Sequence, residues 1–370
     1  MGGDQMNTAQ LKETAEQLFK GYKGLLAMDE SNPTCNKRFA VLGIPQTEEM
    51  RRAYREMIVT TNCLGNCISG AILYDETIRQ KTNDGVPLIK VLIANGIIPG
   101  IKVDTGAKDM AGHPGEKLTG GLEVLPQRLK EYAEMGARFA KWRAVFAIGD
   151  GIPGKDCIEA NAAALAEYAA LCQEAGLVPI VEPEVLMTGE HTMETSAAVT
   201  EEVLHAVFNQ LFIKKVLLEG MILKPNMVAP GLTCPVQKTV EEVANATVKC
   251  LRRCVPAAVP GIAFLSGGQA PELATARLNA MNARFKWKLP WSLTFSFARA
   301  LQQPALDIWK GDDANMRCAQ AALYHRAKCD QSARLGEYDP AMEKRGEDRH
   351  IVKYEAVHKL SGVLETPVTS

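Results

Sequence analysis

The sequence RFAKW (residues 138–142) is followed by CIEANAAALAEYAALCQEA (157–175) and then by LVPIVE (177–182). The first and last segments are short and apolar, with the branched and aromatic residues that buried strands favour. In the middle segment, apolar residues recur at helical spacing. Two strands joined through a helix run parallel, because the helix returns the chain to the same end of the sheet. This unit predicts an α/β fold with a parallel sheet.

The same unit recurs along the chain. Segments typical of strands lie at 24–28, 69–74, 97–102, 138–142, 177–182, 217–223, 261–265 and 293–297. Helix-like stretches lie at 48–60, 125–135, 157–175, 196–211, 239–254 and 271–282. A doubly wound dinucleotide-binding sheet also alternates strands and helices, but no GxGxxG follows the first strand. Eight repeats predict a single (β/α)8 TIM barrel over residues 1–335, followed by a C-terminal tail at 336–370.

Composition argues against several classes of partner. Lys plus Arg (42) and Asp plus Glu (43) nearly cancel, so no global field recruits nucleic acid or an anionic membrane. No apolar run approaches the roughly 20 residues that span a bilayer. The N-terminus resembles an amphipathic helix more than a signal or transit peptide. The ten cysteines show no CxxC or zinc-finger spacing, which favours reduced thiols and a reducing compartment.

Polar residues end seven of the eight predicted strands. In chain order they are Asp29 and Glu30, Lys102 and Asp104, Lys141 and Arg143, Glu182 and Glu184, Lys224, Ser266 to Gly268, and Ser296 with Arg299. In a parallel barrel the carboxyl ends of the strands meet at one rim, where the chemistry takes place. We therefore expect these residues to gather at a single site.

Two pairs of charged residues share a strand face. Lys141 and Arg143 lie two apart, as do Glu182 and Glu184, so each pair points to one side of its strand. Neighbouring strands would bring these cations and anions together in a buried cluster. The alternative is a purely structural ion network, but such a network stabilises little once desolvation is counted. We favour a functional site.

Lys224 ends an apolar strand in LEGMILKPN, where packing alone gives no reason for a lysine. A lysine that extends its ammonium to solvent is the alternative. A lysine nucleophile must be neutral, and at an ordinary pKa only roughly one in 2,500 is neutral at pH 7. Burial and a neighbouring cation such as Lys141 favour the neutral form. Lys224 is the predicted covalent nucleophile.

Two clusters could hold anions. The Ser266-Gly267-Gly268 turn offers backbone N–H groups without bulky side chains, and Arg299 supplies a bidentate cation. Lys37 and Arg38 after the first strand could bind a second anion, although a solvated basic pair fits equally well.

Metal catalysis has little support. The six histidines form no HxH or HxxxH pair and none ends a predicted strand. We expect no metal site and no cofactor.

Seven segments resemble the class I fructose-1,6-bisphosphate aldolases, and more closely their plant and algal branch. They are AMDESN at 27–32, GIKVD at 100–104, FAKWR at 139–143, VPIVEPE at 178–184, LEGMILKPNM at 218–227, FLSGGQ at 264–269 and SFARALQ at 296–302. The resemblance is collinear from about residue 10 to 340. It implies a Schiff-base aldolase that needs no metal and reversibly cleaves fructose 1,6-bisphosphate to dihydroxyacetone phosphate and glyceraldehyde 3-phosphate.

The resemblance also implies roles for individual residues. Lys224 would form the imine, Glu182 would transfer protons during its formation, and Asp29 would accept the C4 hydroxyl proton. Lys141 and Glu184 would assist these catalytic residues. The substrate-binding residues would be Lys102, Arg143, Ser266, Gly267, Gly268, Ser296 and Arg299, with Thr34, Lys37 and Arg38 near a second phosphate.

The alternatives are another Schiff-base barrel lyase or a transaldolase acting on a different sugar phosphate, and a scaffold without catalysis. Two predicted phosphate sites favour a bisphosphate substrate.

The family suggests a homotetramer, and the sequence is compatible with the cytoplasm, or with a plastid if a transit peptide is missing. Family members end in a tyrosine that folds over the site, whereas this chain ends in ETPVTS. Tyr354 is the nearest candidate for that tyrosine.

Overall fold

The computed structural model describes residues 2–344, with side chains from residue 7 onward. Eight parallel strands close into a barrel in the order β1, β2, β3, β6, β7, β8, β9, β10, and β10 pairs with β1. They are β1 (Gly24–Ala27), β2 (Ile68–Leu73), β3 (Ile98–Lys102), β6 (Phe139–Phe146), β7 (Val178–Val185), β8 (Ile222–Leu223), β9 (Gly261–Phe264) and β10 (Ser292–Phe297). The predicted (β/α)8 barrel is confirmed.

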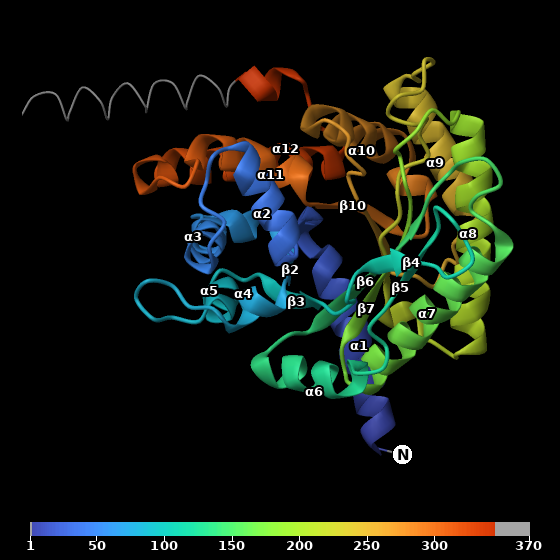
Figure 1. Ribbon diagram of the computed structural model, residues 1–370, viewed down its shortest axis with the longest axis horizontal. Helices are drawn as coiled ribbons and strands as arrows, with labels where there is room; N and C mark the ends of the chain where they lie inside the picture. Colours follow the sequence, from blue (N-terminus) through green and yellow to red (C-terminus); the bar gives the residue numbers. More distant parts are fainter. Residues whose placement is uncertain (1, 345–370) are drawn as a thin grey trace, which may run out of the picture.

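Helices surround the barrel (Figure 1). They are α1 (Gly2–Phe19), α2 (Asn32–Val41), α3 (Glu48–Val59), α4 (Asp75–Arg79), α5 (Leu88–Ala94), α6 (Leu125–Met135), α7 (Lys155–Glu174), α8 (Met193–Ile213), α9 (Val240–Cys254), α10 (Pro271–Phe285), α11 (Arg299–Trp309) and α12 (Met316–Leu335). A short antiparallel hairpin, β4 (Ala107–Asp109) with β5 (Lys117–Thr119), lies outside the barrel sheet and was not predicted. None of the helices in the described part of the chain is long and apolar enough to cross a membrane.

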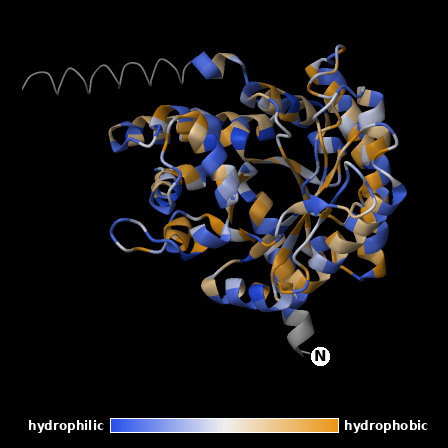
Figure 2. Ribbon diagram, viewed as in Figure 1, coloured by the Kyte–Doolittle hydropathy of each residue, from blue (hydrophilic) through white to orange (hydrophobic). Residues whose placement is uncertain are grey.

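The barrel interior is apolar at its amino end. Inward residues from six strands pack there with one face of α1; they are Leu25, Ala27, Ile72, Phe139, Val178, Ile180, Ile222 and Ala263, with Leu11, Ala15, Leu18 and Phe19 of the helix. A side chain on Gly100 would lie 2.1 Å from the ring of Phe139, so glycine leaves the space that this ring fills. The strands are mainly hydrophobic in Figure 2.

The alternation that buries these residues also positions the charged ones. Side chains two apart on a strand share a face, so Phe139 is followed on the inside by Lys141, and Ile180 by Glu182. The outward residue Trp142 packs instead against α7, where its ring stacks on Tyr168 at 5.5 Å between centroids. Strands β6 and β7 therefore each carry an apolar side chain towards one end of the barrel and an ionic group towards the other.

Three strands differ from the prediction by more than one residue at an end. The segment 217–223 begins with a 3-10 turn (Leu218–Gly220), and only Ile222–Leu223 pairs as a strand. The strands predicted to stop at 142 and 182 continue to Phe146 and Val185. The charged pairs on these two strands therefore lie within the sheet and not beyond its end.

Helix α12 ends at Leu335, and Gly336 follows in the left-handed region with φ +79°. The chain then packs back on the helices, because Tyr338 is buried and Glu343 pairs with Arg326. The boundary of the tail at 335/336 stays a prediction. The predicted role of Tyr354 lies outside the described residues.

Candidate active site

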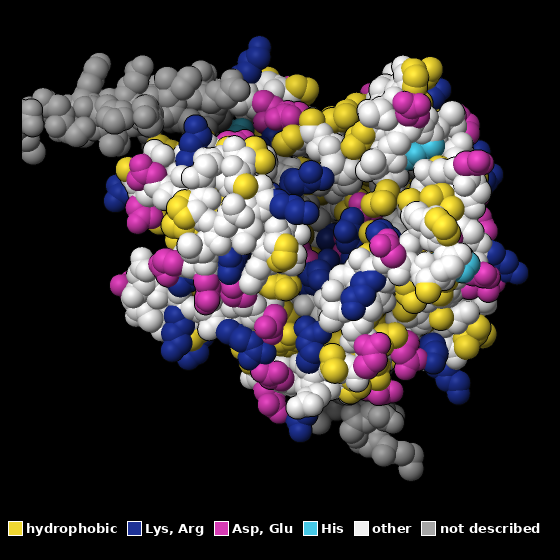
Figure 3. All heavy atoms as spheres, viewed as in Figure 1, with side chains coloured by type: hydrophobic (Ala, Val, Ile, Leu, Met, Phe, Trp, Pro, Cys, Tyr) yellow, Lys and Arg dark blue, Asp and Glu magenta, His cyan; other side chains and the backbone are white. Residues whose placement is uncertain are grey.

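A cavity of about 690 Å³ opens at the carboxyl ends of the barrel strands. Every residue predicted for the site lines it: Asp29, Thr34, Lys37, Arg38, Lys102, Lys141, Arg143, Glu182, Glu184, Lys224, Ser266, Gly267, Gly268, Ser296 and Arg299. Figure 3 shows a hollow at the centre of this face, bordered by Lys and Arg side chains. The fold brings these strand-end residues together in one cavity, and their roles stay predictions.

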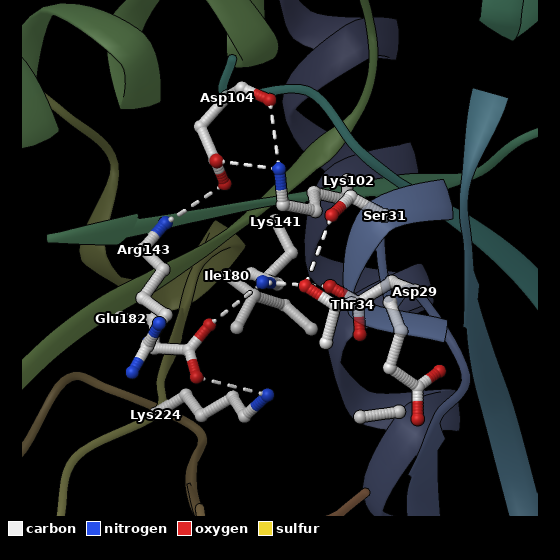
Figure 4. A network of polar contacts seen from close by, with 12 residues as sticks. Asp29, Ser31, Thr34, Lys102, Asp104, Lys141, Arg143, Ile180, Glu182 and Lys224 are labelled. Atoms are coloured by element: carbon white, nitrogen blue, oxygen red, sulfur yellow. Dashed lines mark hydrogen bonds and ion pairs between the residues drawn. The ribbon is translucent and has the colours of Figure 1, made fainter. Parts of the chain in front are cut away.

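Glu182 lies between two lysines at the base of the cavity (Figure 4). Its Oε1 is 3.1 Å from Nζ of Lys224, and its Oε2 is 3.1 Å from Nζ of Lys141. The Lys141 ammonium also contacts Oδ2 of Asp29 at 2.7 Å. All four side chains are buried. The chain of charges runs from Lys224 through Glu182 and Lys141 to Asp29.

The cluster fixes which members are charged. Burial alone raises the pKa of Asp29, but Lys141 and Lys224 outweigh it and lower that pKa to about 2. Glu182 follows the same pattern, and its pKa is lowered by Lys141, Lys224 and Arg143 in spite of its burial. Burial opposes the charged form of Lys141, yet Asp29 and Glu182 raise its pKa. At neutral pH both carboxylates are ionised and Lys141 remains a cation.

A second layer of ion pairs lies closer to the opening. The Arg143 guanidinium donates from Nε to the Glu184 carboxylate. Nζ of Lys102 lies 2.6 Å from Oδ1 of Asp104, which also accepts from the backbone N–H of Gly106. These pairs set the orientation of two cations that face the cavity.

The turn after β9 provides a cradle for an anion. Gly267 and Gly268 adopt φ values of +60° and +88°, which residues with a side chain rarely adopt. A Cβ on Gly268 would lie 3.4 Å from Nη2 of Arg299, so this guanidinium lies against the turn. The hydroxyl of Ser296 is buried at the same cavity and has no hydrogen-bond partner among the described residues. The turn, the arginine and the hydroxyl together suit a phosphate.

The opposite group of predicted anion ligands comes from α2. Lys37 and Thr34 are exposed on the cavity wall. Arg38 also lines the cavity, but its guanidinium is bonded to Glu30, Gln302 and Gln303. Lys37 is thus more available to a ligand than Arg38, and the predicted contact of Arg38 with substrate stays a prediction.

One cavity residue was predicted without a role, and another was not predicted. Asp104 was expected at the site as a strand-end residue, and it holds Lys102 in place. Tyr74 follows β2, the one strand for which no polar end was predicted, and Lys102 lies 6.0 Å from its ring centroid. An aromatic residue after an apolar strand is common and does not indicate a functional site. The position of Tyr74 in the cavity could therefore be recognised only from the structure.

Among the described residues, one group of side chains has the spacing of metal ligands: His325, Cys329 and Glu343. It lies on α12 and the segment after it, and none of its members lines the cavity. Glu343 is already bonded to Arg326 and to the hydroxyl of Tyr338.

Comparison with known proteins gives one family. A family model described as fructose-bisphosphate aldolase class-I matches residues 10–358. A probable fructose-bisphosphate aldolase class 1 of Xanthomonas campestris pv. campestris is 56% identical over 334 residues, covering 90% of this chain and 99% of that protein. Fructose-bisphosphate aldolase 5, cytosolic, of Arabidopsis thaliana is 52% identical over 329 residues, covering 89% and 91%.

A solved structure agrees with these sequences. The fructose-bisphosphate aldolase of Plasmodium falciparum superposes with a TM-score of 0.88 at 46% identity, covering 90% of this chain and 96% of that one. The similarity is not restricted to plants, since the Xanthomonas relative is at least as similar as the Arabidopsis one. The matches extend across the barrel and all the strand ends that form the cavity, and the chain belongs to the class I fructose-bisphosphate aldolase family.

Proposed function

We propose that Lys224 is the residue through which this aldolase forms its Schiff base, with Glu182 as the acid and base of that step. The supporting observation is the position of Glu182, which lies 3.1 Å from the Lys224 ammonium and 3.1 Å from that of Lys141. A lysine in contact with a buried carboxylate can pass its proton directly to that carboxylate. Lys141 has a raised pKa and remains charged while this happens.

The proton transfers follow from this arrangement. Glu182 accepts a proton from Lys224, and the freed amine attacks the C2 carbonyl carbon of the ketose to give a carbinolamine. Glu182 then returns the proton to the departing hydroxyl, which leaves as water, and the iminium forms. The low pKa of Glu182 makes it a carboxylate in the resting enzyme, as the first transfer requires.

We assign the cleavage step to Asp29. Its pKa of about 2 keeps it ionised at neutral pH, so it can accept a proton from the C4 hydroxyl. The C3–C4 bond then breaks, its electron pair moves into the iminium as an enamine, and glyceraldehyde 3-phosphate leaves. Protonation of the enamine and hydrolysis of the imine release dihydroxyacetone phosphate. Asp29 and Glu182 both contact Lys141, which screens the two carboxylates from each other.

The two phosphates would lie at the two ends of the cavity wall. The turn of Ser266 to Gly268 with Arg299 and Ser296 would hold one, and Thr34 and Lys37 would lie near the other. Lys102, Arg143 and Glu184 would bind the hydroxyls between them. This assignment favours a ketose bisphosphate as the substrate.

Covalent trapping tests the assignment. Borohydride added with dihydroxyacetone phosphate should inactivate the enzyme and leave the reduced triose on Lys224, as peptide mapping would reveal. The Lys224→Arg variant should bind the phosphate but trap nothing. A label on Lys141 or on another lysine would refute the assignment. Cleavage should continue in EDTA, because the imine replaces the metal of other aldolases.

We further propose a cytosolic homotetramer. The support is the family and the cytosolic designation of the Arabidopsis relative. Light scattering should give about four times the chain mass of 40.3 kDa, and a mass of one or two chains would contradict the tetramer. Fractionation of the source cells would separate a cytosolic enzyme from a plastid one.

A further inference from the structure

Arg277 on α10 is a buried cation that the catalytic site does not explain. Its relative exposure is 3%, and it does not line the cavity. Among residues 7–344, no carboxylate forms an ion pair with it, and its Nε has no hydrogen-bond partner. Burial lowers its pKa to about 10. An unpaired buried charge costs free energy, so a neutral residue here would stabilise the fold better.

Among residues 7–344 the Arg277 side chain makes one hydrogen bond, and this bond leads to the turn after β9. Nη1 donates to Oε1 of Gln269 at 2.7 Å. Nε2 of Gln269 in turn donates to the carbonyl of Ser266 at 2.8 Å, and the Gln269 backbone N–H donates to the same carbonyl at 3.0 Å. Three residues thus connect α10 with the turn that follows β9.

The chemistry of arginine makes this connection directional. A guanidinium carries only donors, so it can donate only to the oxygen of the Gln269 amide. The nitrogen end must then face the Ser266 carbonyl. In a planar trans peptide the C=O of Ser266 and the N–H of Gly267 point to opposite sides. Holding that carbonyl towards Gln269 therefore turns the Gly267 N–H away from it and fixes the N–H direction within the turn.

We propose that Arg277 is a positioning residue for phosphate binding, which acts through Gln269 on the Ser266–Gly267 peptide and adds a positive charge behind the turn. The proposal rests on the phosphate role proposed above for this turn. A dianion bound there would provide the countercharge that the described residues do not give Arg277. The cost of burying the cation would then be offset in the complex and not in the free enzyme.

The experiment compares Arg277→Met with a matched control, Arg334→Met. Arg334 is also buried with a pKa lowered to about 10 and has no ion pair among residues 7–344, but it donates to the carbonyls of Leu293 and Phe19 away from the cavity. Arg277→Met should raise KM for fructose 1,6-bisphosphate and the inhibition constant of inorganic phosphate by about 5- to 20-fold, with kcat within about threefold. Arg334→Met should lower Tm and leave both constants unchanged.

Arg277→Lys keeps the charge and one donor, so it should recover most of the affinity for phosphate. Gln269→Leu breaks the link, and adding Arg277→Met to it should raise KM by less than Arg277→Met does alone. These two variants carry the test if Arg277→Met does not fold.

The proposal is wrong if Arg277→Met or Gln269→Leu binds inorganic phosphate as the native enzyme does. It is also wrong if Arg334→Met raises KM by the same factor, because the effect would then follow general destabilisation. Trapping on Lys224 separates this outcome from failure of the proposed function. An enzyme that labels Lys224 normally but shows no effect of Arg277 loses only the present proposal.

Discussion

Glu182 shows how one residue obtains its chemical role from its place on a strand. It follows Ile180 on the inward face of β7, so the alternation that buries the isoleucine also buries the carboxylate. Lys224 after β8 and Lys141 on β6 flank it because their strands are the neighbours of β7. A residue between two lysines can serve one as a base while the other keeps the cluster ionised.

Exchanging Glu182 for Gln should separate proton transfer from binding. Glu182→Gln keeps the shape but cannot accept the ammonium proton, so imine formation should slow by about 10²–10⁴. Arg299→Ala should mainly raise KM for phosphorylated substrate through the loss of a charge-assisted contact. Rapid-quench trapping with borohydride measures both. Equal defects in the trapping rate at saturating substrate would contradict this division of roles.

These residue positions were predictable because they depend on two regular features, the alternation along a strand and the common rim of a parallel barrel. Both features can be read from short apolar segments such as LVPIVE. The pairing of Arg38 with Glu30 was not predictable, because it depends on how α2 is oriented over the rim. The same holds for the link from Arg277 to Gln269, which joins two elements by a single side chain.

At the scale of elements, the packing of α12 on α10 buries an ionisable group outside the active site, the carboxyl group of Asp330. Asp330 on α12 is fully buried and accepts a hydrogen bond from the Thr275 hydroxyl of α10 at 2.6 Å. Burial raises its pKa to about 7, although Arg326 at 3.6 Å opposes the shift, and Glu343 and Glu272 add to it. The contact between these helices therefore depends on a carboxyl group that favours its neutral form.

The pKa of Asp330 predicts a stability change with pH. The folded protein holds this proton up to about pH 7, whereas the unfolded chain releases it near pH 4. The unfolded state therefore binds fewer protons in this window, and the contribution of Asp330 to stability falls as the pH rises, by at most about 4 kcal/mol. Asp330→Asn keeps the acceptor for Thr275 and cannot ionise.

The Tm of Asp330→Asn, relative to the native protein, should increase between about pH 4 and pH 7 and level off above that, because both states have then lost the Asp330 proton. Comparing the two proteins at each pH cancels the other titrating groups. A constant difference across that range would show that Asp330 ionises in the fold as it does in water.

Element boundaries were harder to predict than element types. The segment 217–223 is uniformly apolar apart from Glu219, and nothing in its pattern separates the 3-10 turn from the two-residue strand β8. The β4–β5 hairpin has exposed residues and no apolar alternation, so it gave no strand signal. Where tertiary packing sets the end of a strand, the hydrophobic pattern of the sequence cannot predict that end.

At the scale of the whole molecule, barrel closure pairs Leu25 with Ser296. The pairing of β1 with β10 joins the first strand to the last, so the predicted anion ligands from α2 and from the start of α11 share one cavity. The two groups come from different helices, and neither Lys37 nor Arg299 is bonded to the other among the described contacts. They should therefore act as two independent phosphate sites, the property that a bisphosphate substrate requires.

Substrates with one phosphate test that independence. If each group binds its own phosphate, one of the two variants Lys37→Ala and Arg299→Ala should lower kcat/KM for fructose 1,6-bisphosphate about 5- to 50-fold and leave fructose 1-phosphate unaffected. The other variant should lower both. Their effects on the bisphosphate should add as free energies in the double variant, because the sites share no partner. Equal losses on both substrates from both variants would mean that the cavity attracts anions through its overall charge and has no separate phosphate sites.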